Sequence, residues 1–231
     1  MAGLLTGNKT ATMAERGPDF YASPYAALPP LLVAERRRLP RTIWEPSCGN
    51  GALVLPLRNR GYEVIASDLH DWGCPDSHPH IDFFSQRTTE IADLIPDDGR
   101  FGIVTNPPFG GVEEYIERAV GLAPYVALLL RLAFLESEGR MNWFPHVGLR
   151  RVHVIGERLP IMHRHGYEGP KLSNAGMCFA WYIFERGKNP IRQVPIRWVS
   201  WKDAVKRYPQ TDADSPPVAK DQYGLFEGAA A

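Results

Sequence analysis

Residues 42–51 read TIWEPSCGNG and combine a strand-like run with a glycine turn. The run at 42–45 predicts a β-strand, and Asn50 is the expected start of a helix that reaches about Asn59. Gly49 and Gly51 would let the backbone approach a ligand closely, and a helix start offers unpaired N–H groups. Such a turn is typical of nucleotide-binding folds, although tight turns also need glycine for their conformation alone.

Short apolar runs alternate with amphipathic segments after this turn, which indicates an α/β fold. The continuous apolar run at 126–130 is typical of a central strand covered on both faces. The strands predicted at 151–155 and 177–185 should form a closing pair. The further predicted strands are 62–68, 80–84, 101–105, 126–130, 151–155 and 177–185, and the further predicted helices are 91–95, a segment from Val112, and 134–142.

The composition favours one domain in a reducing compartment. Of 231 residues, 26 are basic and 26 acidic, so any polyanion site must be a local patch. An odd, scattered set of three cysteines argues against a disulfide framework. No apolar run approaches the length of a membrane span. We therefore expect a soluble protein of the cytoplasm, with a flexible segment at 1–18 and a Pro-rich extension at 188–231 that is partly disordered at its end.

Acidic residues follow two of the predicted strands. Asp68 ends the strand after the glycine turn, where a carboxylate can accept hydrogen bonds from ribose hydroxyls. The alternative is that Asp68 caps a helix. Asp82 and Phe83 follow the next predicted strand. An acid there can bind the amino group of adenine while the phenyl ring packs on the adenine face.

The tetrapeptide Asn106-Pro107-Pro108-Phe109 follows the predicted strand 101–105. Its two prolines end the sheet ladder and make a rigid turn. The Asn106 side-chain oxygen and the Pro107 carbonyl are two acceptors that can hold both protons of an –NH2 group, which frees the nitrogen lone pair to attack a sulfonium methyl group. Phe109 offers a face on which a planar substrate can stack. By itself the tetrapeptide could be only a turn, but its place after the glycine turn and Asp68 favours a catalytic role.

These residues resemble the S-adenosylmethionine-dependent amino-methyltransferases that act on adenine N6 or cytosine N4. The glycine segment resembles their cofactor loop, and Asn106 to Phe109 resembles their NPPF or NPPY catalytic tetrapeptide. Upstream, residues 19–24, DFYASP, resemble the family's Y-x-T-P segment, with Ser23 in place of the usual threonine. The resemblance covers residues 19–187, and the small size is similar to that of phage or prophage enzymes.

The resemblance implies a Rossmann-like class I methyltransferase domain over 19–187, with a seven-stranded, mostly parallel sheet and a C-terminal antiparallel hairpin. It implies S-adenosylmethionine as the cofactor, with Glu45 at the methionine amino group, Asp68 at the ribose, and Asp82 with Phe83 at the adenine. The implied cofactor-binding residues are Tyr21, Ser23, Pro24, Glu45, Pro46, Gly49, Gly51, Asp68, Leu69, Asp82, Phe83 and Asn106. The implied catalytic residues are Asn106, Pro107, Pro108 and Phe109.

A basic stretch is the candidate surface for the substrate. Residues 140–171 hold six Lys or Arg against two acids, with aromatic side chains nearby. Basic groups with aromatics are suited to phosphates and stacked bases, although the stretch could also be an ordinary solvated face. The candidate substrate-binding residues are Phe109, Trp143, Arg164 and Lys171. The family's separate target-recognition domain has no counterpart here, so we expect low sequence specificity.

The expected activity is methylation of adenine N6 in DNA. The alternatives are cytosine N4, ribosomal RNA or a protein glutamine as the target, and a non-catalytic cofactor-binding module. A zinc site at His70, Cys74, His78 and His80 is a rival interpretation of one histidine-rich stretch, but it lacks the paired Cys-x2-Cys spacing of structural zinc sites. We therefore predict no metal.

Overall fold

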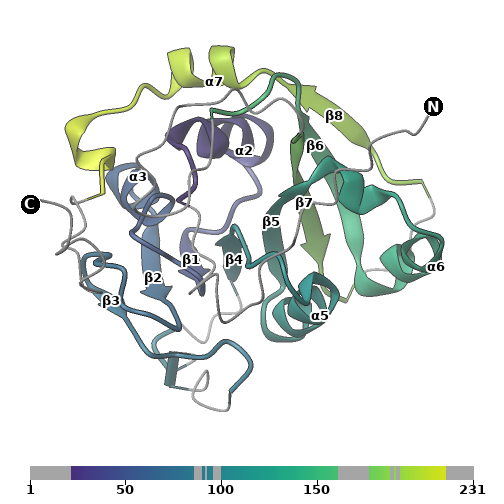
Figure 1. Cartoon of the computed structure of the whole chain (residues 1–231), viewed down its shortest axis with the longest axis horizontal. Coiled ribbons are helices and arrows are strands. Elements are labelled where there is room, and N and C mark those ends of the chain that lie inside the picture. Colours follow the sequence, from purple (N-terminus) through teal and green to yellow (C-terminus); the bar gives the residue numbers. More distant parts are fainter. Residues whose placement is uncertain are drawn as a thin grey trace, which may run out of the picture.

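The computed structural model describes residues 22–85, 90–91, 93–95, 100–160, 177–187, 190 and 193–216. Eight strands form one sheet in the order β3-β2-β1-β4-β5-β7-β6-β8 (Figure 1). The strands are β1 (Thr42–Glu45), β2 (Glu63–Ser67), β3 (Ser77–His78), β4 (Phe101–Thr105), β5 (Tyr125–Arg131), β6 (Leu149–Ile155), β7 (Phe179–Glu185) and β8 (Ile196–Val199). Only β7 runs against its neighbours β5 and β6.

Helices cover both faces of the sheet. On one face lie α2 (Leu28–Glu35), α3 (Val54–Asn59) and α7 (Trp201–Arg207), and on the other lie α5 (Val112–Leu122) and α6 (Glu138–Val147) (Figure 1). Three short 3-10 helices complete the described elements: η1 (Tyr25–Ala27), η2 (Leu132–Leu135) and η3 (Asp212–Asp214). Within the described segments, no helix has the length and apolar character that crossing a bilayer would need.

Alternation along the central strands divides the core into two layers. In β5, Ala127 and Leu129 pack toward α2 and α3, whereas Val126 and Leu128 pack toward α5 and α6. All four side chains are fully buried. Because β5 is apolar on both faces, it can only lie inside a two-sided sheet, as its sequence predicts.

The predicted mixed α/β fold is confirmed, and β6 and β7 form the expected antiparallel pair. The predicted number of seven strands is wrong, because β8 adds an eighth strand parallel to β6. The four residues of β8 come from the Pro-rich region after 187, where the sequence predicts an extension rather than a strand. Pro195 stands directly before β8, and its carbonyl accepts the Val152 N–H. A proline can therefore begin this edge strand without loss of a ladder bond.

Three predicted elements have different bounds. The predicted helix at 50–59 begins only at Val54, because the turn that contains Gly51 occupies the preceding residues. The predicted strand at 80–84 is wrong: the strand is Ser77–His78, and Asp82 caps a turn instead. The predicted helix at 134–142 is split into η2 and α6. In each case a local turn overrides the apolar pattern.

Candidate active site

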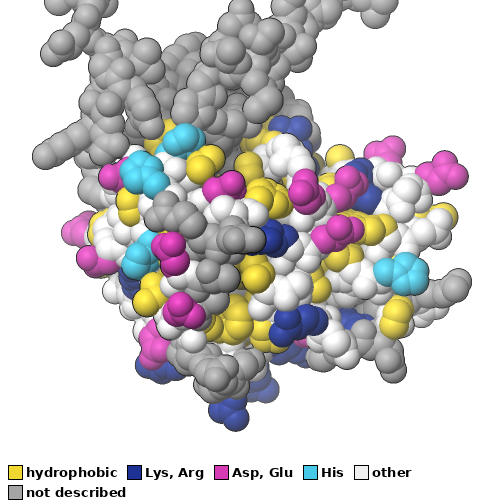
Figure 2. All heavy atoms as spheres, turned by 90° about the horizontal axis from the view of Figure 1, so that it is seen from below, with side chains coloured by type: hydrophobic (Ala, Val, Ile, Leu, Met, Phe, Trp, Pro, Cys, Tyr) yellow, Lys and Arg dark blue, Asp and Glu magenta, His cyan; other side chains and the backbone are white. Residues whose placement is uncertain are grey.

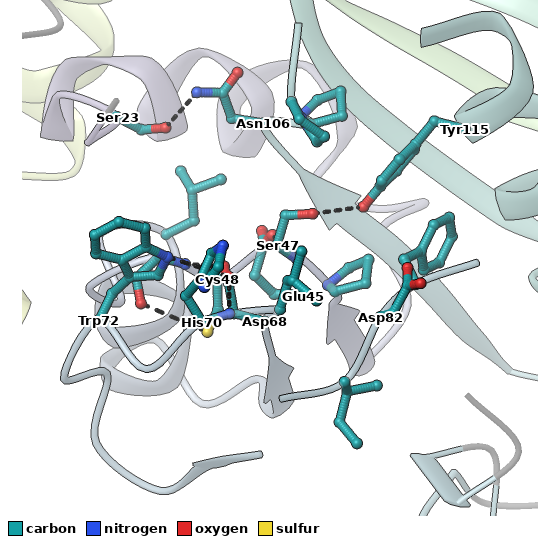
Figure 3. Close-up of a pocket in the computed structure, with 18 of the residues that line it drawn as sticks. Ser23, Glu45, Ser47, Cys48, Asp68, His70, Trp72, Asp82, Asn106 and Tyr115 are labelled. Atoms are coloured by element: carbon teal, nitrogen blue, oxygen red, sulfur yellow. Dashed lines mark hydrogen bonds between the residues drawn. The ribbon is translucent and has the colours of Figure 1, made fainter. Parts of the chain in front are cut away.

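A cavity of about 780 Å³ opens where β1, β2 and β4 end (Figure 3). β1 lies between β2 and β4, so the chain leaves β1 toward one side of the sheet and returns on the other. Such a reversal point in a parallel sheet is where ligands bind in open α/β folds. Of the residues predicted for the site, those that line this cavity are Ser23, Glu45, Pro46, Gly49, Asp68, Leu69, Asp82, Phe83, Asn106, Pro107, Pro108 and Phe109.

The glycine turn after β1 depends on backbone conformations that favour glycine. Gly49 and Gly51 have φ angles of 53° and 90°. A Cβ atom on Gly51 would also lie 3.0 Å from the Cys74 sulfur. The turn is fixed to β2 by the N–H of Cys48, which donates to the Ser67 carbonyl at 3.0 Å. Substitution of either glycine would therefore displace the cavity wall.

Asp68 joins the loops that follow β1 and β2. Its Oδ2 accepts the Gly49 N–H at 2.9 Å. Its Oδ1 accepts the His70 N–H at 3.0 Å and the Trp72 indole N–H at 3.2 Å. Burial raises the pKa of Asp68 despite these donors. Three of about four lone-pair sites are occupied, so the carboxylate organises the loops and keeps capacity for a further donor.

Glu45, at the end of β1, is a buried carboxylate that is only partly satisfied. Its Oε1 accepts the Ser47 N–H at 3.2 Å. Its Oε2 has no hydrogen-bond partner among the described residues. Burial raises the pKa of Glu45 well above its usual value, although the nearby Thr105 hydroxyl and the Ser47 N–H lower it, and the Asp68 charge raises it further. A cationic ligand group in the cavity would relieve this cost.

Asn106 is held with its amide oxygen unpaired. Its Nδ2 lies 3.0 Å from the Ser23 hydroxyl oxygen, and this contact joins segments 83 residues apart (Figure 3). Its Oδ1 is buried and has no partner in the described part of the chain. Pro107 and Pro108 follow directly and line the same cavity. The site therefore presents a fixed acceptor at the end of β4.

An aromatic cluster forms another wall. Tyr115 of α5 stacks on Phe83 with ring centroids 4.2 Å apart, and Trp44 tilts against the same phenyl ring at 5.6 Å. The Tyr115 hydroxyl lies 2.9 Å from the Ser47 hydroxyl (Figure 3), and burial raises the pKa of Tyr115 well above its usual value. Asp82 is exposed, and its Oδ1 accepts the Phe84 N–H at 2.9 Å.

Several cavity residues are not predicted from the sequence. Tyr115 fits the apolar spacing of α5, so periodicity alone predicts a core residue. The others lie beside predicted residues, within the glycine turn or the loops after β2 and β3. The lining residues that the sequence does not predict are Ser47, Cys48, Asn50, Ala52, Leu53, His70, Trp72, Ile81, Phe84, Gly110 and Tyr115.

Some predicted residues lie elsewhere. Pro24 and Gly51 flank lining residues without lining the cavity themselves. Trp143 lies on α6, where its indole N–H donates to Glu117 of α5 at 2.8 Å, and it does not line the cavity. Tyr21, Arg164 and Lys171 lie outside the described residues, as does most of the loop at 160–175.

The basic stretch contributes little free charge in its described part. Arg140 pairs with Glu113 at 2.9 Å, Arg151 pairs with Glu35 at 2.9 Å, and Arg150 is buried. Figure 2 shows acidic and basic side chains interspersed over the described part of one face rather than gathered by sign. Nor do three or more His, Cys, Asp or Glu side chains of the described segments gather as a metal site would require.

Comparisons with known proteins show the fold. No protein-family model and no curated protein match the sequence. A structure from Listeria monocytogenes, assigned to the class I S-adenosylmethionine-dependent methyltransferases, is similar with a TM-score of 0.52 and 13% identity, over 81% of this chain and 69% of the other. The methyltransferase subunit of a type I restriction-modification system from Streptococcus thermophilus is similar with a TM-score of 0.50 and 10% identity, over 89% of this chain and 51% of the other. The chain therefore has the Rossmann-like fold of class I methyltransferases.

Proposed function

We propose that this chain is an S-adenosylmethionine-dependent methyltransferase that methylates the N6 amine of adenine in DNA, with low sequence specificity. One observation carries the proposal. The Asn106 side chain is fixed through its nitrogen by Ser23, and its buried oxygen has no partner among the described residues. A buried acceptor without a donor is costly, and an amine that binds there would satisfy it.

The cavity suits S-adenosylmethionine in size and in chemistry. Its volume of about 780 Å³ lies within the usual range for small-molecule sites. The unpaired Glu45 Oε2 fits the ammonium group of the methionine part. Asp68 keeps one acceptor position for a ribose hydroxyl, and the ring of Phe83 lies in the wall for the adenine. The Asn50 side-chain oxygen is a further buried acceptor without a partner in the described segments.

The chain's own residues would prepare the target nitrogen. When bound, the cofactor supplies a methyl group on a positively charged sulfur. Asn106 Oδ1 and the Pro107 carbonyl accept the two amine protons, which directs the nitrogen lone pair away from the ring. Phe109 stacks on the target base. Because both prolines hold this turn rigid, little reorganisation is needed when the substrate arrives.

The tetrapeptide with phenylalanine favours adenine through its resemblance to the amino-methyltransferases. A base within a duplex would have to leave the stack to reach Asn106. Cytosine N4, ribosomal RNA and a protein glutamine carry amines that the same turn could hold, so they are the alternative outcomes of the test.

The test uses purified protein, tritiated S-adenosylmethionine and three substrates in parallel: unmethylated DNA, ribosomal RNA and a glutamine-containing peptide. We expect label in DNA alone, and nucleoside analysis that identifies N6-methyladenine in many sequence contexts. Label as N4-methylcytosine, in RNA or in peptide would replace the proposed substrate. Calorimetry that detects no binding of S-adenosylmethionine would refute the proposal as a whole.

A further inference from the structure

Arg131 stands at the end of β5, beside the tetrapeptide that ends β4. The two strands are parallel neighbours with Thr105 opposite Leu128. The Arg131 guanidinium carbon lies 4.9 Å from the centre of the Phe109 ring. The backbone is held as well, because the Arg131 carbonyl accepts the Tyr182 hydroxyl at 3.1 Å. An exposed cation is thus fixed against the ring that the proposed function assigns to the target base.

Among the described residues, carboxylates engage several arginines but not Arg131. Arg60 pairs with Asp214 at 2.7 Å, Arg140 with Glu113, and Arg151 with Glu35 and Glu185. Within the described residues, no salt bridge includes Arg131. A planar guanidinium on an aromatic ring keeps its N–H edges for a bidentate anion, and phosphate fits that geometry.

A second hollow, of about 660 Å³, begins at Arg131. Its walls are mainly apolar, and they include Ile196 and Trp198 of the edge strand β8. Trp198 is 69% exposed, the largest exposed fraction among the exposed large hydrophobic side chains of the described residues. Two strands, β7 and β6, separate Trp198 from Arg131 in the sheet. An exposed indole at that separation is suited to a stacked base further along a strand. Glu136 also lines this hollow, so a phosphate would bind on the Phe109 side of Arg131, away from that carboxylate.

We propose that Arg131 binds a backbone phosphate next to the target base and that Trp198 stacks on a base further along the same strand. The inference rests on the proposed function and deepens it, because it makes the substrate a polynucleotide strand rather than a free nucleoside or a peptide. Phosphate and stacking contacts carry little sequence information. The site would therefore bind strands of many different sequences.

The test measures fluorescence anisotropy of a labelled, adenine-containing single-stranded oligonucleotide, together with methyl-transfer kinetics. We expect Arg131→Gln to weaken binding roughly tenfold and to lower the slope of log affinity against log salt by about 1. Arg131→Lys should recover the salt slope but only part of the affinity, because lysine keeps the charge and loses the planar fork. Trp198→Ala should weaken binding roughly tenfold with little change in the salt slope. In all three variants KM should change more than kcat.

Arg197→Gln is the matched control, because Arg197 is exposed on the same strand but does not line the hollow. It should leave binding and salt slope unchanged. Unaltered oligonucleotide binding in Arg131→Gln and Trp198→Ala, while the parent protein methylates DNA, would overturn this inference and leave the proposed function intact. Loss of cofactor affinity or of thermal stability in these variants would instead assign them a structural role. A parent protein that neither binds nor methylates nucleic acid would overturn both.

Discussion

Two buried glutamates at opposite ends of the sheet differ in how fully their carboxyl oxygens are hydrogen-bonded. Glu35, at the end of α2, lies near the edge where β5 and β6 begin, and Glu45 lies where β1 ends. They are 0% and 1% exposed. Glu35 Oε1 lies 2.9 Å from Arg151 Nε and 2.7 Å from His153 Nε2, and its Oε2 accepts from Arg151 at 3.0 Å. Glu45 has one backbone donor and one unpaired oxygen.

The pKa values follow these surroundings. Burial alone would raise the pKa of Glu35, but the bonds from His153 and Arg151 outweigh it and hold the pKa below its usual value. Burial raises the pKa of Glu45 because no cation is near it among its contributing groups. The Glu35 carboxylate is therefore satisfied by the chain itself, whereas Glu45 keeps an oxygen for a ligand. Stability and binding are assigned to different ends.

The largest effect on stability should come from the Glu35 network. Glu35→Ala leaves Arg151 with Glu185 as its remaining carboxylate and takes the acceptor from His153, and we expect it to lower the free energy of unfolding by about 3 kcal/mol. Urea titration followed by circular dichroism measures this change. Glu63→Ala is the control, since the Arg41–Glu63 pair is exposed on both sides and should contribute about 1 kcal/mol or less. Equal losses of unfolding free energy in the two variants would show that the buried network stabilises the protein no more than an exposed ion pair does.

At the cavity, Asn106→Ala should affect the rate of methyl transfer rather than the stability of the protein. We expect methyl transfer to fall by about 10²–10³-fold, with cofactor affinity and unfolding free energy nearly unchanged. Single-turnover kinetics and calorimetry separate the two quantities. Asn59→Ala removes an asparagine that bonds to Asp214 and does not line the cavity, and it should keep the full rate. A parallel loss of binding and rate in Asn106→Ala would contradict its role.

The two carboxylates should also respond to pH with opposite sign. A lowered folded-state pKa means that Glu35 stabilises the protein above its unfolded pKa, and this stabilisation is lost as pH falls through the folded pKa. Glu45 has a raised folded-state pKa, so the protein loses stability as the pH rises from the unfolded-state pKa of Glu45 toward its folded-state pKa. Glu45→Gln should therefore stabilise the ligand-free protein at neutral pH by about 1 kcal/mol, yet weaken cofactor binding. Unfolding across acidic to neutral pH checks the sign, and a destabilised variant at neutral pH would refute it.

A smaller effect is expected from Ser23. Ser23→Ala removes the partner of Asn106 Nδ2, and we expect up to about tenfold slower methyl transfer, as for the loss of one hydrogen bond. Ser200→Ala is the converse control, because its side chain caps α7 by accepting the Asp203 N–H. It should cost about 1 kcal/mol of stability and leave the rate alone. If Ser23→Ala had no effect on rate, the orientation of Asn106 would not depend on this bond.

Local patterns predict the central strands and the cavity turns, but not β3 or β8. β4 has the predicted bounds, and the residues of the glycine turn and the tetrapeptide meet at one cavity. The charge pattern predicts less, because a count of charges along residues 140–171 cannot tell that Arg140 and Arg151 are paired with carboxylates. Arg131 lies outside the counted stretch. Its position after a buried run, at the end of a strand, is nevertheless a pattern that indicates a candidate site residue. Pairing depends on topology, which the local sequence does not contain.

The contact between Ser23 and Asn106 also bears on the order of folding. Its partners are 83 residues apart, so it can form only after β4 has joined the sheet and the segment before η1 has returned to it. Such distant contacts are late and are easily lost by local opening. A chain with an intact sheet but an undocked segment at 22–24 would be folded by most spectroscopic criteria and yet inactive. Hydrogen exchange of the Ala27 N–H, which donates to the Pro24 carbonyl at 2.9 Å, would then report the active fraction better than global unfolding does.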